Sequence, residues 1–142
     1  MNKQFAVITG GSSGIGLATA ISFAQRGINI HLIARNITNL ERVKNDIEEK
    51  FGIIVFIYSC DVSSYADLEV VFESIHALSN IDYLICNAGV MICGKIEDIS
   101  VSDLERTMNI NYYGTLNTYK AAIGYVECQH YFVPRLASIL LI

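Results

Sequence analysis

The chain has little of what separates one domain from another: its 142 residues include a single proline, and no segment is of low complexity. Hydrophobic residues make up 52% of the sequence, which is enough for a sizeable core. No internal repeat is present beyond an alternation of apolar runs and helical patterns. These features predict one globular domain over residues 1–142, without an internal linker.

Two further absences concern partners. The formal net charge is −4 and Lys and Arg form no run, which argues against nucleic acid as a partner. Long apolar runs are lacking too, because the apolar stretch at residues 136–142 is far too short to span a bilayer. Residues 1–4 lead directly into the first apolar run, so we expect no signal peptide, anchor or transmembrane segment.

Metal-binding patterns are lacking as well. The four cysteines have no C-x-x-C spacing, and no histidine is placed to complete a zinc set, so we expect no metal site. They are Cys60, Cys86, Cys93 and Cys128. Three of them lie in or beside apolar runs, which predicts buried, reduced thiols and a reducing compartment such as the cytoplasm. His31, His76 and His130 are scattered, and we expect structural roles for them.

What the sequence does contain is a glycine-rich stretch, Thr-Gly-Gly-Ser-Ser-Gly-Ile-Gly, at residues 9–16. It follows the apolar run at residues 5–8 and precedes a helical pattern that begins near Leu17. A helix N-terminus offers unpaired N–H groups and partial positive charge, and glycine lets the backbone approach a phosphate closely. The stretch therefore predicts a site for a dinucleotide pyrophosphate; the alternative is a tight turn that binds nothing.

The rest of the chain alternates strand and helix patterns. Apolar runs predict strands at residues 5–9, 29–34, 53–58 and 81–86, and residues 133–142 could supply a fifth. The first predicted helix covers residues 13–26 and stops at Gly27, and the second carries Leu40, Val43 and Ile47 and ends at Gly52. The third is capped by Ser63 or Ser64 and has one apolar face, formed by Leu68, Val71, Phe72, Ile75 and Leu78. The fourth is opened by Ser100, or by Ser102 with Glu105, and runs to about Glu127 despite Gly114 and Gly124.

Nearly apolar strands separated by helices indicate an α/β fold with a doubly wound, parallel sheet of the Rossmann type. We expect this sheet to stop after about the fifth strand. In such a sheet a ligand binds at the carboxyl ends of the strands. The residues that follow each strand are therefore the candidates for chemistry.

The second strand is followed by Arg35 and Asn36. A site for NAD usually places a carboxylate at the end of this strand, where it accepts a hydrogen bond from the ribose 2′-hydroxyl, but Ala34 stands there. A guanidinium can clamp a 2′-phosphate, whereas a carboxylate would repel it. Arg35 thus favours NADP(H), unless it is only a solvated residue at the start of a helix.

The third and fourth strands also end in suggestive residues. Asp61 can accept a hydrogen bond from the adenine amino group while Val62 covers the ring; otherwise Asp61 would be a helix cap. Asn87, Ala88 and Gly89 follow the fourth strand. Small residues there let the chain pass close to a cofactor, and the Asn87 amide can brace the central strands, although a plain turn would look similar.

Together these motifs resemble the short-chain dehydrogenase/reductase family. Its Thr-Gly-x-x-x-Gly-x-Gly stands at Thr9–Gly16, its Asp-Val at Asp61-Val62, its Asn-Ala-Gly at Asn87–Gly89, and the Asn of its catalytic tetrad at Asn111. The resemblance covers roughly residues 3–125. It implies NADPH as cofactor, contacted by Gly10, Ser12, Ser13, Gly14, Ile15, Gly16, Arg35, Asp61, Val62, Asn87, Ala88 and Gly89. It also implies a catalytic role for Asn111, which would hold a water for proton relay.

Within the family, residues 32–36 and 94–112 are most similar to 3-ketodihydrosphingosine (3-dehydrosphinganine) reductases. This resemblance implies a lipid substrate, a long-chain 3-keto base reduced to its 3-hydroxy form, and work at the cytosolic face of the endoplasmic reticulum. One departure is Asn39, where these reductases often carry a Lys. It predicts a lower affinity for the cofactor.

The proton donor that the family uses is missing. The family pairs a Tyr with a Lys four residues later, and none of the eight tyrosines has this partner; Tyr131 has Arg135, with Pro134 between them. The family's Ser would fall near Ser138, but no glycine-containing turn follows it, and residues from about 127 onward fit the family poorly.

Three hypotheses remain open: part of a long-chain keto-base reductase, a truncated module that binds a dinucleotide without turnover, and a reductase for a steroid or another ketone. A half sheet would also expose an apolar strand edge, which predicts self-association and a possible homo-oligomer.

Overall fold

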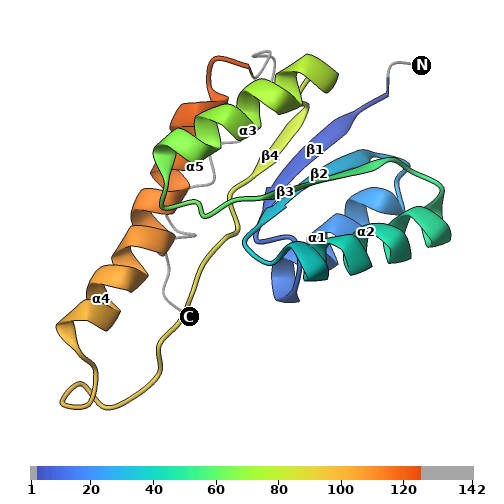
Figure 1. The fold of residues 1–142 in the computed structure, drawn as a ribbon. Coiled ribbons are helices and arrows are strands. Elements are labelled where there is room, and N and C mark those ends of the chain that lie inside the picture. The colour runs from blue at the N-terminus through green and yellow to red at the C-terminus, as the bar shows by residue number, and fades with distance from the viewer. Residues whose placement is uncertain (1–2, 126–142) are drawn as a thin grey trace.

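The computed structural model describes residues 3–125, which form a parallel sheet with helices on both faces (Figure 1). The strands are β1 (Phe5–Thr9), β2 (Asn29–Ala34), β3 (Val55–Ser59) and β4 (Tyr83–Ile85), in the order β3-β2-β1-β4. All three strand pairings are parallel. The predicted doubly wound α/β fold is therefore confirmed. The expected fifth strand and Ser138 lie outside the described residues.

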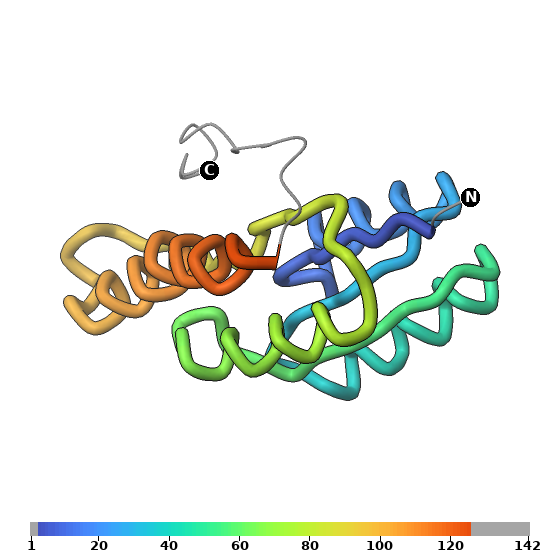
Figure 2. The backbone as a smooth tube through the Cα atoms, turned by 90° about the horizontal axis from the view of Figure 1, so that it is seen from above, coloured from blue at the N-terminus to red at the C-terminus, as the bar shows by residue number. Residues whose placement is uncertain are grey.

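Alternate residues of each strand face two separate cores. On one face, Ile8 of β1 and Leu32 of β2 pack under α1 (Gly14–Ala24) and α2 (Ile37–Phe51). On the other face, Val7 and Ile33 pack under α3 (Tyr65–Leu78) and α5 (Gly114–Ala122). Figure 2 shows α3 and α5 side by side on that second face. Burial on both faces explains why the strands are largely apolar.

Helix ends follow the predicted polar and glycine residues. Ser64, one of the two predicted caps, accepts a hydrogen bond from the backbone N–H of Asp67 at the start of α3. Ser100, the first of the two predicted openings, caps α4 (Val101–Met108) in a capping box with Asp103, the third residue of the helix. The alternative opening by Ser102 with Glu105 is therefore wrong. Gly52 ends α2 with a φ of 65°.

The long helix predicted from Ser100 is continuous but not uniform. Between α4 and α5, residues Asn109–Tyr113 form a π-helical segment, η1. Gly114 allows a close approach, because a Cβ on Gly114 would lie 2.5 Å from Cγ2 of Val62. The helix ends at Ala122 and residues 123–125 form a turn, so the prediction that it runs to about Glu127 is wrong.

Several residues lie differently from expectation. The last apolar residue of the predicted α3 face, Leu78, is 56% exposed because it ends the helix beyond the core. Cys60 is buried as expected and Cys86 is half-buried, but Cys93 is exposed in the loop after β4. Cys128 lies outside the described residues.

No helix in the part of the chain that the structure describes is long and apolar enough to cross a bilayer.

His31 has the structural role expected for it. Its side chain on β2 is fully buried, with Nδ1 3.1 Å from the Tyr58 hydroxyl and Nε2 2.8 Å from the hydroxyl of Ser79, the C-cap of α3. The ring also stacks on Phe56. Burial lowers the pKa of His31 to about 4, so the ring is neutral at pH 7. It joins β2, β3 and the end of α3.

Candidate functional site

A cleft of about 740 Å³ lies at the carboxyl ends of the strands. Most of the residues predicted from the sequence line it: Gly10, Ser12, Ser13, Gly14, Ile15, Arg35, Asp61, Val62, Asn87, Ala88 and Gly89. The cleft is also lined by residues that are not among the predicted cofactor contacts: Ile33, Ala34, Asn36, Cys60, Val90 and Ile110. Four of them adjoin a predicted contact at a strand end, namely Ala34, Asn36, Cys60 and Val90, so strand position was the signal available for them. The predicted residues Gly16 and Asn111 are not among the lining residues.

The glycine turn after β1 lies in close contact with the residues that follow β4 and with the first turn of α1. Gly10 has a φ of 68°, and a Cβ on it would lie 2.9 Å from the Cα of Ala88. A Cβ on Gly16 would collide with the carbonyl of Gly10 and the amide of Asn87. Glycine is therefore required at both positions, because any side chain would push the turn away from β4.

The N-terminus of α1 opens directly into this turn. The helix begins at Gly14, its N-cap Ser13 makes no side-chain capping bond, and its first turn carries no acidic residue. The first N–H groups of a helix have no intrahelical partner and carry partial positive charge. Since Ser13, Gly14 and Ile15 line the cleft, this end of the helix can accept an anionic group.

Thr9 and Asn87 join the ends of β1 and β4. The backbone N–H groups of Asn87 and Ala88 donate to the Thr9 hydroxyl at 3.0 and 3.1 Å, and Asn87 Nδ2 donates to the Thr9 carbonyl at 3.1 Å. The expectation that Asn87 braces the central strands is thus met by its contacts. Thr9, which is buried, was not among the predicted site residues although it begins the glycine motif.

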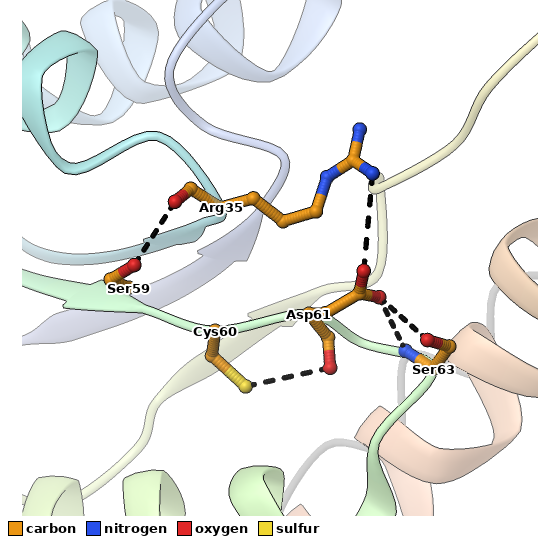
Figure 3. A network of polar contacts seen from close by, with 5 residues as sticks. All are labelled: Arg35, Ser59, Cys60, Asp61 and Ser63. Atoms are coloured by element: carbon orange, nitrogen blue, oxygen red, sulfur yellow. Dashed lines mark hydrogen bonds and ion pairs between the residues drawn. The ribbon is translucent and has the colours of Figure 1, made fainter.

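The ends of β2 and β3 present opposite charges to the cleft (Figure 3). The guanidinium of Arg35 lies 3.9 Å from the carboxylate of Asp61, and both side chains are part-exposed. Asp61 Oδ1 accepts two hydrogen bonds from Ser63, from its backbone N–H at 2.9 Å and its hydroxyl at 2.8 Å. Asp61 is thus held by Ser63 on one oxygen and faces Arg35 with the other.

The charge state of Asp61 follows from these contacts. Partial burial raises the pKa of its carboxyl, but the two hydrogen bonds from Ser63 and the positive charges of Arg35 and Arg106 outweigh burial. The net effect is a pKa below the usual value. Asp61 is therefore an anion at neutral pH, able to accept further hydrogen bonds.

Asn111 acts on the wall of the cleft from behind. In the π-helical segment, its Oδ1 accepts from the backbone N–H of Val90 at 2.8 Å and its Nδ2 donates to the Val90 carbonyl at 2.8 Å. This paired contact fixes the loop after β4, where Val90 lines the cleft. Among residues 3–125 no group of His, Cys, Asp and Glu is placed to hold a metal ion, and no tyrosine lines the cleft.

Known proteins are similar to this chain in sequence and in fold. A family model described as short chain dehydrogenase matches residues 4–131. A 3-ketodihydrosphingosine reductase of Bos taurus is 42% identical over an alignment of 124 positions, and the alignment covers 83% of this chain. The chain spans 37% of the length of that relative.

Two solved structures superpose well on this chain. An alcohol dehydrogenase from the archaeon Thermococcus sibiricus, complexed with 5-hydroxy-NADP, has a TM-score of 0.82 at 29% identity, covering 87% of this chain and 53% of that one. A NAD⁺-bound xylitol dehydrogenase has a TM-score of 0.82 at 31% identity, covering 87% of this chain and 48% of that one. Because the family model covers most of the sequence and dehydrogenase structures share its sheet, the chain belongs to the short chain dehydrogenase family.

Proposed function

We propose that the chain binds NADPH in the cleft and is the nucleotide-binding part of an NADPH-dependent reductase that acts on a long-chain 3-keto base. The observation that carries the proposal is Arg35, which lines the cleft at the end of β2 where Ala34 leaves no carboxylate. A cationic fork at this place favours a phosphorylated ribose over a free 2′-hydroxyl.

Each part of the cofactor has a matching part of the cleft. The pyrophosphate would lie against the glycine turn and the N-terminus of α1, where N–H groups are unpaired. The adenine would lie beside Asp61 and Val62, with its amino group donating to the carboxylate. The nicotinamide end would lie near the loop at Asn87–Gly89, whose residues line the cleft. Both structural neighbours bind a dinucleotide of this type, one of them a derivative of NADP and the other NAD⁺.

The substrate class rests on the similarity to the Bos taurus protein, which is named as a 3-ketodihydrosphingosine reductase. Bound NADPH supplies the hydride for the carbonyl carbon. What this chain's own residues contribute is the nucleotide site and the Val90 loop held by Asn111. A lipid substrate would suit work at the cytosolic face of the endoplasmic reticulum.

A second candidate is a module that holds NADPH without turnover. It is favoured by one observation: no tyrosine of the 142 residues is followed by a lysine four residues later. A reductase for another ketone or a steroid would share the same nucleotide site.

Fluorescence titration of the 142-residue chain with NADPH and NADH tests the proposal. We expect NADPH to bind more tightly, and Arg35→Ala to remove most of that preference, since one charge-assisted contact contributes about 1.5–3 kcal/mol. Arg42→Ala, on the exposed side of α2, is the matched control and should keep the preference. Equal binding of both cofactors, or a preference that survives Arg35→Ala, would refute it.

Turnover separates the first candidate from the second. NADPH oxidation by the full-length gene product is followed with 3-ketodihydrosphingosine as substrate, and with a steroid ketone beside it, because the 142 residues alone do not contain the family's Tyr and Lys pair. Oxidation with the sphingoid ketone alone supports the reductase; tight NADPH binding without oxidation supports the binding module.

A further inference from the structure

The helix formed by α4, η1 and α5 touches the loops on both sides of the cleft. Asn111 holds the loop after β4, as described above. Six residues later, Asn117 of α5 donates from Nδ2 to the carbonyl of Val62 at 3.2 Å and to that of Ser63 at 3.3 Å. Asn117 does not line the cleft, and it belongs to none of the motifs found in the sequence.

We infer that Asn117 is a positioning residue for the adenosine end of the bound dinucleotide, and that it acts through Val62 and Ser63 on the carboxylate of Asp61. The inference rests on the proposed function, because it assigns a role at the same cleft. It concerns the side of the cleft opposite to the loop that Asn111 holds.

The first step of this chain of contacts is the attachment of α5 to the loop. Gly114 lies one turn before Asn117, and it lets the helix backbone approach Val62 closely. Thr118, which is buried, binds the same turn of the helix, because its hydroxyl donates to the Gly114 carbonyl at 2.7 Å. The loop after β3 therefore rests on a rigid surface, and the two bonds from Asn117 fix where its backbone lies.

The second step runs from the loop to the carboxylate. The carbonyl of Ser63 accepts a hydrogen bond from Asn117. The backbone N–H and the hydroxyl of the same serine donate to Oδ1 of Asp61. If Ser63 shifts, the direction in which Oδ2 points shifts with it. Figure 3 shows that Oδ2 is the oxygen that faces Arg35. Asn117 thus reaches, through one residue, both polar groups proposed for the adenosine end.

The probe is adenosine 2′,5′-bisphosphate, which carries the adenine and the phosphorylated ribose without the nicotinamide. Its dissociation constant is measured by calorimetry on the 142-residue chain. We expect Asn117→Leu, which keeps the volume and removes the donors, to weaken binding about fivefold, as for the loss of one or two hydrogen bonds. The control is Asn109→Leu on the same helix, where the side chain is exposed and makes no hydrogen bond in the structure.

A double-mutant cycle separates positioning from general damage. If Asn117 acts through Asp61, Asn117→Leu should cost little further affinity once Asp61→Asn is in place, because the losses of binding free energy from two residues linked by the same hydrogen bonds are not additive. The same fivefold loss in both backgrounds, or no loss from Asn117→Leu alone, would overturn the inference. Should Asn117→Leu fail to fold, Ser63→Ala takes its place, with loss restored by Ser63→Thr; unchanged affinity in Ser63→Ala would also overturn it.

Failure of the proposed function has a different signature. If the unchanged chain does not bind the probe, the nucleotide site itself is refuted and the inference falls with it. If the unchanged chain binds the probe but the Asn117 and Asn109 variants bind equally well, the site stands and only the positioning role is lost.

Discussion

Helices α2 and α4 carry similar sequence patterns but pack differently. Each begins at a polar N-cap whose side chain accepts a backbone hydrogen bond three residues later, Asn36 in α2 and Ser100 in α4. Each has one apolar face. In α2 this face is buried against the sheet through Leu40, Val43 and Ile47. In α4 no side chain is buried.

The cause is the position of the two helices relative to the sheet. Figure 1 shows α2 lying along the strands and α4 extending beyond their carboxyl ends. Val101, Leu104 and Met108 of α4 are 71%, 46% and 52% exposed within the described structure. An amphipathic pattern thus tells which side of a helix is apolar, and the topology decides whether the sheet covers that side.

Core truncation should give the largest contrast between the two helices. Leu40→Ala in α2 should lower the free energy of unfolding by about 2–5 kcal/mol, because it leaves a cavity under a fully buried side chain. Leu104→Ala in α4 should change it by less than about 0.5 kcal/mol. Urea unfolding of both variants measures this. Equal losses would mean that α4 is packed against something that the described residues do not include.

Acid should weaken the sheet region at the buried His31. Its pKa is about 4 in the folded chain against 6.5 in the unfolded one, so the unfolded chain binds more protons between these values. The stabilisation is complete above pH 6.5 and lost as the pH falls toward 4, by up to about 3 kcal/mol. Unfolding midpoints from pH 7.5 to 4 measure it. His76→Gln, at an exposed site on α3, should lose stability with falling pH as the unchanged chain does. If His31→Phe still showed the same loss between pH 6.5 and 4, the assignment of that loss to His31 would be contradicted.

Removing the N-caps should give a smaller difference. Asn36→Ala should lower the free energy of unfolding by about 1 kcal/mol, because α2 is part of the core and loses a capping bond. Ser100→Ala removes the capping box of α4 and should mainly increase amide exchange within α4, with a global change below about 0.5 kcal/mol. Hydrogen exchange and urea unfolding together decide this. A global loss from Ser100→Ala as large as that from Asn36→Ala would remove the distinction between the helices.

The sequence predicted those features that depend on local pattern. Strand β2 was predicted at the bounds the structure has, because a run buried on both faces is mostly apolar and polar residues stand at its two ends. The cleft was predicted for a related reason: once the sheet is parallel, Gly10, Arg35, Asp61 and Asn87 must meet at one edge.

Contacts between distant parts of the chain could not be predicted in the same way. The amide of Asn117 could meet many backbone carbonyls, and nothing near it in the sequence indicates Val62 or Ser63. The exposure of Cys93 was missed for the converse reason, since an apolar neighbourhood in sequence does not mean an apolar neighbourhood in space. Asp103 replaced Glu105 as the capping partner because the helix begins two residues earlier than that alternative requires.

The π-helical segment makes the length of the long helix matter as much as its composition. A π turn accommodates one residue more than an α turn, and each residue of an α-helix advances the side-chain direction by about 100°. Deleting one residue from Asn109–Tyr113 would therefore convert the segment into an ordinary α turn and leave α5 in its place, with Thr118 in the core and Asn117 at the β3 loop. Such a deletion would instead remove the wider turn that carries Asn111 and its contact with Val90. In an alignment of related chains, a one-residue gap in this segment would therefore affect the Val90 loop rather than the packing of α5.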